Sequence, residues 1–131
     1  MKSSLLQLSR IFKQRADIKL VYLFGSRAHD ETGPLSDYDF ALYADTQDFK
    51  RLYDLKLSIQ DELSRSLKTD NVDVVVLNTT ESPELKYEII TKGKLIFERE
   101  PFRVMIEPKI LNEYFDFHLQ LERYGLTKAK P

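Results

Sequence analysis

The stretch Tyr22–Tyr43 constrains the fold of this chain more than any other part of it. It contains an apolar run, a Gly25-Ser26 turn, a polar excursion and a second run that carries Asp37 and Asp39. Ten residues separate the Gly-Ser pair from Asp37. Apolar runs bounded by turn residues are typical of strands. We therefore expect two strands, with a glycine turn beside a pair of carboxylates.

The second run alternates with the period of a β-strand. Asp37 and Asp39 face one side, and the aromatic residues Tyr38 and Phe40 face the other. Because the aromatic side must meet the core, we expect the two carboxylates to point outward into a cleft. Acids two positions apart on a strand lie roughly 6 to 7 Å apart at the backbone, and together they can bind a hard cation such as Mg²⁺. An isolated Asp-x-Asp is more often a solvated strand end, so the pair alone is weak evidence.

A third acid, Asp73, interrupts the β-branched run Asn71–Leu77. On a neighbouring strand it would complete a cluster able to hold two metal ions about 3.5 to 4 Å apart. Without metal, two such charges about 4 Å apart repel by roughly 4 kcal/mol at an effective dielectric constant of 20. Asp73 alone could be a strand-edge residue, but a cluster of three acids is hard to explain as structure.

Gly25-Ser26 supplies the features of a phosphate site. Glycine permits a sharp turn and a close approach of the backbone, and exposed amides with the Ser26 hydroxyl suit an anion. Arg27 could contact a phosphate or form a surface salt bridge. We expect a short helical turn from Arg27 to Asp30 and a polar loop over residues 30–36. A phosphate site facing a two-metal carboxylate cluster indicates nucleotidyl transfer.

The other elements follow from periodicity and from helix signals. Apolar spacing predicts helices over about 3–15 and 48–68, the latter with an apolar stripe. Ser82-Pro83 predicts a helix start, and Gly93 predicts its end. The remaining predicted strands are Lys19–Phe24 and Lys94–Phe97. The stripe predicted for the second helix consists of Phe49, Leu52, Tyr53, Ile59, Leu63 and Leu67.

The C-terminal part shows a different pattern. Pro101 and Pro108 predict an irregular connector, followed by a helix over about 109–124. The apolar residues of this helix recur at steps of four, three, four and three, which indicates a seam for another helix, within the chain or on a partner. The seam consists of Ile110, Tyr114, Phe117, Leu121 and Tyr124. The sequence predicts an α/β (α+β) fold with a small mixed sheet, flanking helices and a C-terminal helical arm. We divide it into residues 1–98 and 99–131.

Composition excludes several classes of protein. The chain has 131 residues, a length typical of one domain. Its net charge is −1, from 20 basic and 21 acidic residues, which gives no general electrostatic attraction to nucleic acid. It has no cysteine, and no apolar run reaches the length of a membrane span or signal peptide. We therefore expect a cytoplasmic protein without direct contact to membrane or nucleic acid.

The spacing of Gly25-Ser26 and Asp37-Tyr38-Asp39 resembles the signature of the DNA polymerase β-like nucleotidyltransferase superfamily. Within it, the compact size and the segments LFGSRA, SDYDFAL and VDVVVLN are similar to the minimal nucleotidyltransferases (MNT family). The resemblance covers residues from about 18 to 97. Several such proteins are antitoxins paired with HEPN-domain ribonuclease toxins, which they inactivate by transferring AMP from ATP to a toxin tyrosine.

The resemblance implies a catalytic and metal-binding role for three acids. Asp37 and Asp39 become ligands of two Mg²⁺ ions, and Asp73 becomes the third ligand or the proton acceptor. It also implies a nucleotidyltransferase fold and an ATP substrate, with a HEPN toxin as partner in a hetero-oligomer.

The same resemblance assigns the nucleotide contacts. Gly25 and Ser26 hold the β- and γ-phosphates of ATP, and Arg27 can reach the triphosphate. One position departs from the family pattern: many relatives have Arg-Gly where this chain has His29-Asp30.

The leading hypothesis is therefore an antitoxin that acts as a Mg²⁺-dependent protein adenylyltransferase. Two alternatives stay open at this point. The chain could modify a small molecule such as an aminoglycoside, or it could neutralise a toxin by binding alone. Nucleic-acid polymerisation is disfavoured by the near-zero net charge.

Overall fold

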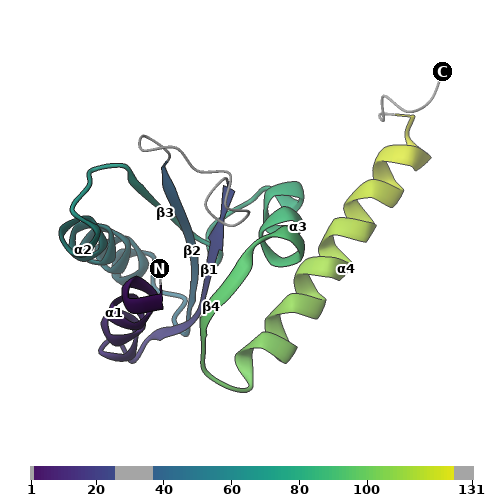
Figure 1. The fold of residues 1–131 in the computed structure, drawn as a ribbon. Coiled ribbons are helices and arrows are strands. Elements are labelled where there is room, and N and C mark those ends of the chain that lie inside the picture. The colour runs from purple at the N-terminus through teal and green to yellow at the C-terminus, as the bar shows by residue number, and fades with distance from the viewer. Residues whose placement is uncertain (1, 26–36, 126–131) are drawn as a thin grey trace.

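The computed structural model describes residues 2–25 and 37–125, and it contains one mixed sheet with helices on both faces (Figure 1). The strand order is β3-β2-β1-β4; β1 is antiparallel to β2 and β4, and β2 is parallel to β3. This confirms the predicted fold class. The elements are α1 (Lys2–Lys13), β1 (Ile18–Phe24), β2 (Tyr38–Ala44), α2 (Phe49–Leu67), β3 (Val72–Val76), α3 (Pro83–Lys92), β4 (Lys94–Glu98) and α4 (Phe102–Arg123).

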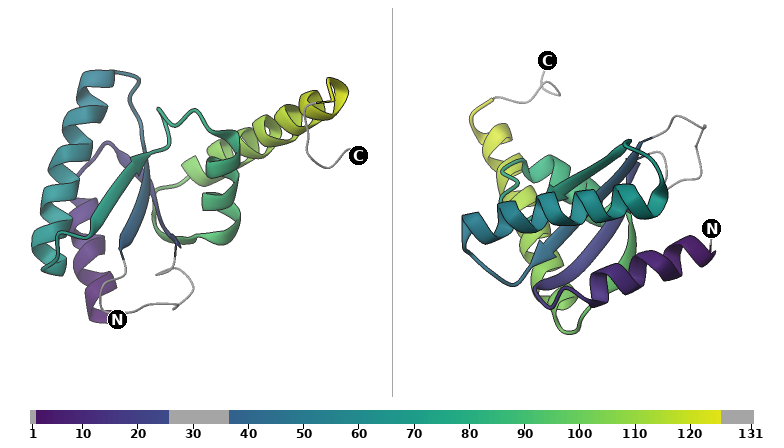
Figure 2. Two further views of the ribbon diagram at one scale, coloured as in Figure 1. Left: turned by 90° about the horizontal axis from the view of Figure 1, so that it is seen from above. Right: turned by 90° about the vertical axis from the view of Figure 1, so that its left-hand side faces the viewer.

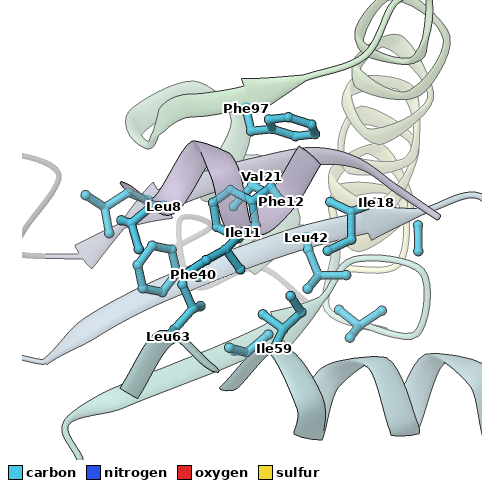
Figure 3. Close-up of a cluster of buried hydrophobic side chains, with 14 of the residues drawn as sticks. Leu8, Ile11, Phe12, Ile18, Val21, Phe40, Leu42, Ile59, Leu63 and Phe97 are labelled. Atoms are coloured by element: carbon cyan, nitrogen blue, oxygen red, sulfur yellow. The ribbon is translucent and has the colours of Figure 1, made fainter. Parts of the chain in front are cut away.

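Helices α1 and α2 cover one face of the sheet, which we call the first face (Figure 2). Phe12 of α1 is almost fully buried there, with its ring centroid 5.8 Å from that of Phe97 and 6.5 Å from that of Phe40. Figure 3 shows these rings among the branched aliphatic side chains of α2 and the strands. The prediction that Phe40 faces the core is confirmed.

The apolar stripe predicted for α2 is partly wrong. Leu52, Ile59 and Leu63 are buried, but Phe49 and Tyr53 are 75% and 62% exposed. Phe49 and Tyr53 lie one turn apart near the start of the helix, and they line a surface hollow together with Leu52. The first turns of the helix therefore keep two aromatic side chains at the surface.

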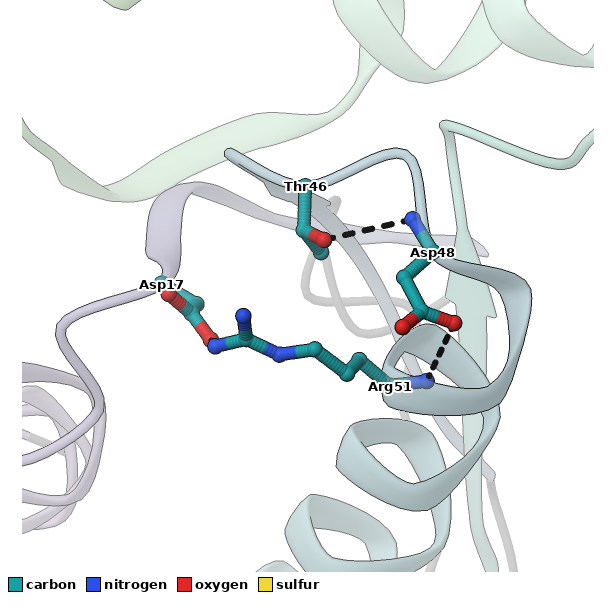
Figure 4. A network of polar contacts seen from close by, with 4 residues as sticks. All are labelled: Asp17, Thr46, Asp48 and Arg51. Atoms are coloured by element: carbon teal, nitrogen blue, oxygen red, sulfur yellow. Dashed lines mark hydrogen bonds and ion pairs between the residues drawn. The ribbon is translucent and has the colours of Figure 1, made fainter.

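Polar contacts fix the turn between β2 and α2 (Figure 4). The Asp48 carboxylate accepts hydrogen bonds from the backbone N–H groups of Lys50 and Arg51, which satisfies two free donors of the first helical turn. The Asp48 N–H donates to the Thr46 hydroxyl at 3.2 Å. Arg51 forms a 2.6 Å ion pair with Asp17, at the end of the loop that enters β1. The two connections at this end of the sheet are thus joined.

Helices α3 and α4 cover the second face. Ser82 accepts a hydrogen bond from the Leu85 N–H at the start of α3, and the Gly93 N–H donates to the Ile89 carbonyl at its end, as predicted. Ala41 of β2 is fully buried beneath these helices. The helices thus cover this side of β2 at Ala41, whereas the cleft was predicted for Asp37 and Asp39 at the start of the strand.

Helix α4 is longer than the sequence predicts. It begins at Phe102 and continues through Pro108, so the predicted irregular connector is wrong. A proline inside a helix removes one backbone hydrogen bond and costs roughly 3 kcal/mol. Burial of Ile106 and Ile110, on either side of Pro108, offsets that cost.

The predicted seam is used within the chain over its first part. Tyr114 stacks on Tyr87 of α3 with ring centroids 3.8 Å apart, and Lys86 of α3 forms a 2.6 Å ion pair with Glu113. Tyr124, at the end of the seam, is 70% exposed. Figure 1 shows the C-terminal part of α4 extending beyond α3. No helix in the described part of the chain is long and apolar enough to cross a membrane.

Candidate active site

The three predicted acids gather at one end of the second face. Asp39 is the register partner of Asp73 across the parallel strands β2 and β3, and Phe24 is its partner on β1. Asp37 directly precedes β2, which begins at Tyr38 rather than at the predicted Asp37. Asp39 and Asp73 have the strand parity of residues on the second face, but they lie at the end that α3 and α4 do not bury.

The electrostatics of Asp39 show that the acids influence one another. Burial raises the pKa of the Asp39 carboxyl above its ordinary value, and the charges of Asp73 and Asp37 raise it further. Asp37 and Asp73 are exposed, whereas Asp39 is half-buried. A cation among the three carboxylates would replace this repulsion with attraction.

The acids are near one another without forming a closed ligand set. In the ranges 2–25 and 37–125, no group of three Asp, Glu, His or Cys side chains converges closely enough to hold a metal ion. The strand register fixes the backbones of Asp39 and Asp73, whereas the exposed side chains of Asp37 and Asp73 can rotate about χ1. Mg²⁺ binds through one or two carboxylates together with substrate phosphates and water, so the donor set fits this ion.

Gly25, at the end of β1, borders the site. Its φ of +75° lies in the left-handed region that favours glycine. A Cβ placed on it would lie 2.5 Å from Oδ2 of Asp39, so a side chain there would collide with the carboxylate. The backbone at the end of β1 therefore lies against the central acid of the cluster. The other predicted contacts, Ser26 and Arg27, lie outside the described residues, as does His29-Asp30.

Sequence reasoning missed a contact that positions α4. The Tyr22 hydroxyl donates a 2.6 Å hydrogen bond to Oε2 of Glu107, which also accepts one from Arg103 at 3.2 Å. Burial and the neighbouring Glu107 carboxylate raise the pKa of Tyr22. The two partners are 85 residues apart in the sequence, and Glu107 lies where a connector was predicted. No local pattern could have paired them.

Comparison with known families places the chain in one of them. A family model described as "Polymerase beta, Nucleotidyltransferase" matches residues 7–102. The chain therefore belongs to the polymerase β nucleotidyltransferase family. A search of curated proteins found no match.

Solved structures extend the likeness to nearly the whole chain. A toxin–antitoxin structure with AMP-PNP is 27% identical with a TM-score of 0.70, and the match covers 95% of this chain and 94% of that one. A mutant of the toxin–antitoxin MntA-HpeT, in which two aspartates two positions apart are changed to glutamate, is 26% identical with a TM-score of 0.70 over 96% and 94%. A third structure contains a tri-AMPylated HEPN toxin of Shewanella oneidensis in complex with MNT antitoxin. It is 24% identical with a TM-score of 0.67 over 95% and 93%, and shows the fold alone.

Proposed function

We propose that this chain is an antitoxin that transfers AMP from ATP to a tyrosine of a HEPN-domain toxin. The observation that carries the proposal is the placement of Asp39, with Asp73 beside it in register and the Gly25 backbone against its carboxylate. Membership of the nucleotidyltransferase family supports the reaction class. The similar toxin–antitoxin structure with AMP-PNP supports the nucleotide and the kind of partner.

The spacing of the acids adds a second line of support. In the similar MntA-HpeT mutant the two altered aspartates are two positions apart, which is the spacing of Asp37 and Asp39. In this chain Asp37, Asp39 and Asp73 would hold Mg²⁺. When bound, the metal neutralises charge on the triphosphate and acidifies the attacking hydroxyl.

Other roles in the transfer fall to Gly25 and Asp73. The glycine at position 25 lets the backbone approach a phosphate, and it keeps the space beside Asp39 free of a side chain. The acceptor tyrosine hydroxyl has an ordinary pKa near 10, so it needs a base. In the transfer its oxygen forms a bond to the α-phosphorus and the bond to the pyrophosphate oxygen breaks. The phenolic proton passes to Asp73, an exposed carboxylate at the rim of the site.

Binding without catalysis is the second candidate. It is favoured by one observation, the absence of three converging acids among the described residues. A protein that neutralises a toxin by docking alone would need no assembled metal site.

One experiment separates the two candidates. The chain is incubated with a HEPN-domain toxin, ATP and Mg²⁺, and the mass of the toxin is measured. We expect mass gains in multiples of AMP, and a rate at least about 10²-fold lower for Asp37→Asn/Asp39→Asn. Asp54→Asn, an exposed acid on α2, is the matched control and should leave the rate unchanged. No mass gain with wild type, together with neutralisation by the double variant, would establish binding alone.

A further inference from the structure

An exposed apolar stripe runs along α4 on the side away from its buried residues. It consists of the exposed residues Val104, Pro108, Phe115 and Leu119 and the half-buried Leu111, and we call it the α4 stripe. Val104 is 73% exposed, Phe115 57% and Leu119 53%. The steps of four, three, four and four place these residues on one helical face about 22 Å long. A contiguous exposed apolar patch of this kind marks an interaction surface.

The stripe begins in two adjoining hollows that share Arg103 and Val104. One, of about 430 Å³, lies between the end of β4 and α4 and is also lined by Glu98, Glu100 and Pro101. The other, of about 370 Å³, continues along α4 and is also lined by Glu107, Pro108 and Leu111. Together they form a groove with apolar proline, valine and leucine surface.

The groove is acidic at its rim. Three glutamates line it, with one arginine. The Arg103 Nε already donates to Glu107, 3.2 Å away, so its charge is balanced within the chain. Glu98 and Glu100 are both exposed and add two negative charges. A partner with basic side chains would match this rim.

Pro108 removes one backbone hydrogen bond of the helix beside the groove. Because proline has no N–H, it cannot donate to the carbonyl of Val104 one turn earlier. Val104 lines both hollows. An arginine or lysine side chain in the groove could donate hydrogen bonds to the glutamates that line it.

We propose that the α4 stripe and its acidic groove bind a helix of the HEPN toxin whose apolar residues are flanked by lysine or arginine. This inference rests on the proposed function for the identity of the partner. An apolar stripe with helical spacing suits a helix packed along it. The match to the toxin–antitoxin structure spans 95% of this chain, so it includes most of α4. A second copy of this chain fits less well, because it would bring a second acidic rim to the interface.

Substitution in the stripe tests the surface. Val104→Glu and Leu119→Glu each place a charge on an exposed position, so the fold should be retained. Phe49→Glu is the matched control, because Phe49 is 75% exposed on α2 on the opposite face. The Kd for the HEPN protein is measured by titration calorimetry, with folding checked by circular dichroism. We expect the Kd to rise at least about tenfold for each stripe variant, the size of a central interface residue, and to stay unchanged for the control.

The outcomes separate this inference from the proposed function. Unchanged Kd in both stripe variants, with AMP transfer intact, overturns the surface and leaves the function standing. If wild type binds the HEPN protein and the stripe variants bind it more weakly, the proposed surface is supported. If wild type then transfers no AMP, the proposed enzymatic function is overturned. A wild-type chain that is a dimer alone and becomes monomeric in Val104→Glu overturns the assigned occupant.

A charge reversal tests the acidic rim independently. Glu98→Lys/Glu100→Lys should slow association and reduce its dependence on salt, because steering by opposite charges is lost. Glu81→Lys/Glu84→Lys, at two exposed acids before and at the start of α3, makes the same change in net charge elsewhere. Equal effects of the two pairs on the association rate would contradict the charge argument.

Discussion

The two faces of the sheet are built differently. Among the residues whose burial is described, the first face carries a cluster of sixteen buried residues supplied by α1, α2 and all four strands. By the same count the second face carries seven, ends before Asp39 and Asp73, and includes the polar pair Tyr22 and Glu107. The larger core is continuous and apolar, so it supplies most of the hydrophobic stabilisation. Helices α3 and α4 leave one end of this face uncovered, and the candidate site lies at that end.

The largest expected effect on stability is a cavity in the first face. Phe12→Ala removes a ring packed between Phe40 and Phe97 and should lower the free energy of unfolding by about 3 to 5 kcal/mol. Ile110→Ala, its counterpart on the second face, should cost about 2 kcal/mol, the low end for such a change, because the surrounding core is smaller. Urea unfolding measures both. Equal losses would show that the second face contributes as much as the first.

A smaller effect is expected at the glycine beside the acids. Gly25→Ala combines a positive φ with a collision against Asp39, and should cost about 1 to 3 kcal/mol. Gly125→Ala is the matched control, because Gly125 has a φ of +66° and nothing within 4 Å of its added Cβ. It should cost about 1 kcal/mol or less. Thermal unfolding and AMP transfer are measured for both, and loss of transfer should follow Gly25→Ala alone. Equal behaviour of the two variants would show that contact with Asp39 has no role.

The smallest expected effect is a pH-dependent gain in the stability of Asp39→Asn relative to wild type. The raised pKa of Asp39 means that the folded state prefers the protonated carboxyl. The contribution of this group to stability is therefore complete below its unfolded pKa of about 3.9, and is lost as pH rises through the folded pKa. Asp39→Asn removes the loss, so the variant should be slightly more stable than wild type at pH 7 and no more stable near pH 3.

With Mg²⁺ at neutral pH, wild type should become more stable than Asp39→Asn. Binding to the folded state stabilises wild type, and Asp39→Asn lacks one ligand, so only wild type should gain. Thermal unfolding with Mg²⁺ and then with EDTA measures the change. If Mg²⁺ stabilises the variant as much as wild type, Asp39 is not a metal ligand.

Strong local signals made most of the fold predictable. The β-branched and aromatic runs around Val21, Phe40 and Val74 gave the strands, and Ser82 and Gly93 gave the bounds of α3. The error at Pro108 arose because a proline rule describes local cost, whereas packing of Ile106 and Ile110 decided the outcome. Tertiary packing overrides local preference in this way.

The site was predictable in part for the same reason. Strand parity placed Asp37 and Asp39 on one side, and the structure adds the register that brings Asp73 beside Asp39. Register depends on the pairing of whole strands, so the sequence could suggest this neighbour but could not establish it. The exposure of Phe49 likewise depends on the angle at which α2 meets the sheet, which no periodicity specifies.

The hydrogen bond between Tyr22 and Glu107 fixes the position of α4 relative to β1 and its glycine turn. Tyr22 lies three residues before Gly25 on the same strand, a span of roughly 10 Å at the rise of a β-strand. If the toxin helix docks on α4 as proposed, the β1 backbone holds it in a set position relative to the glycine turn. Under the proposed function, only an acceptor hydroxyl at a matching distance from the docked helix could then reach the site.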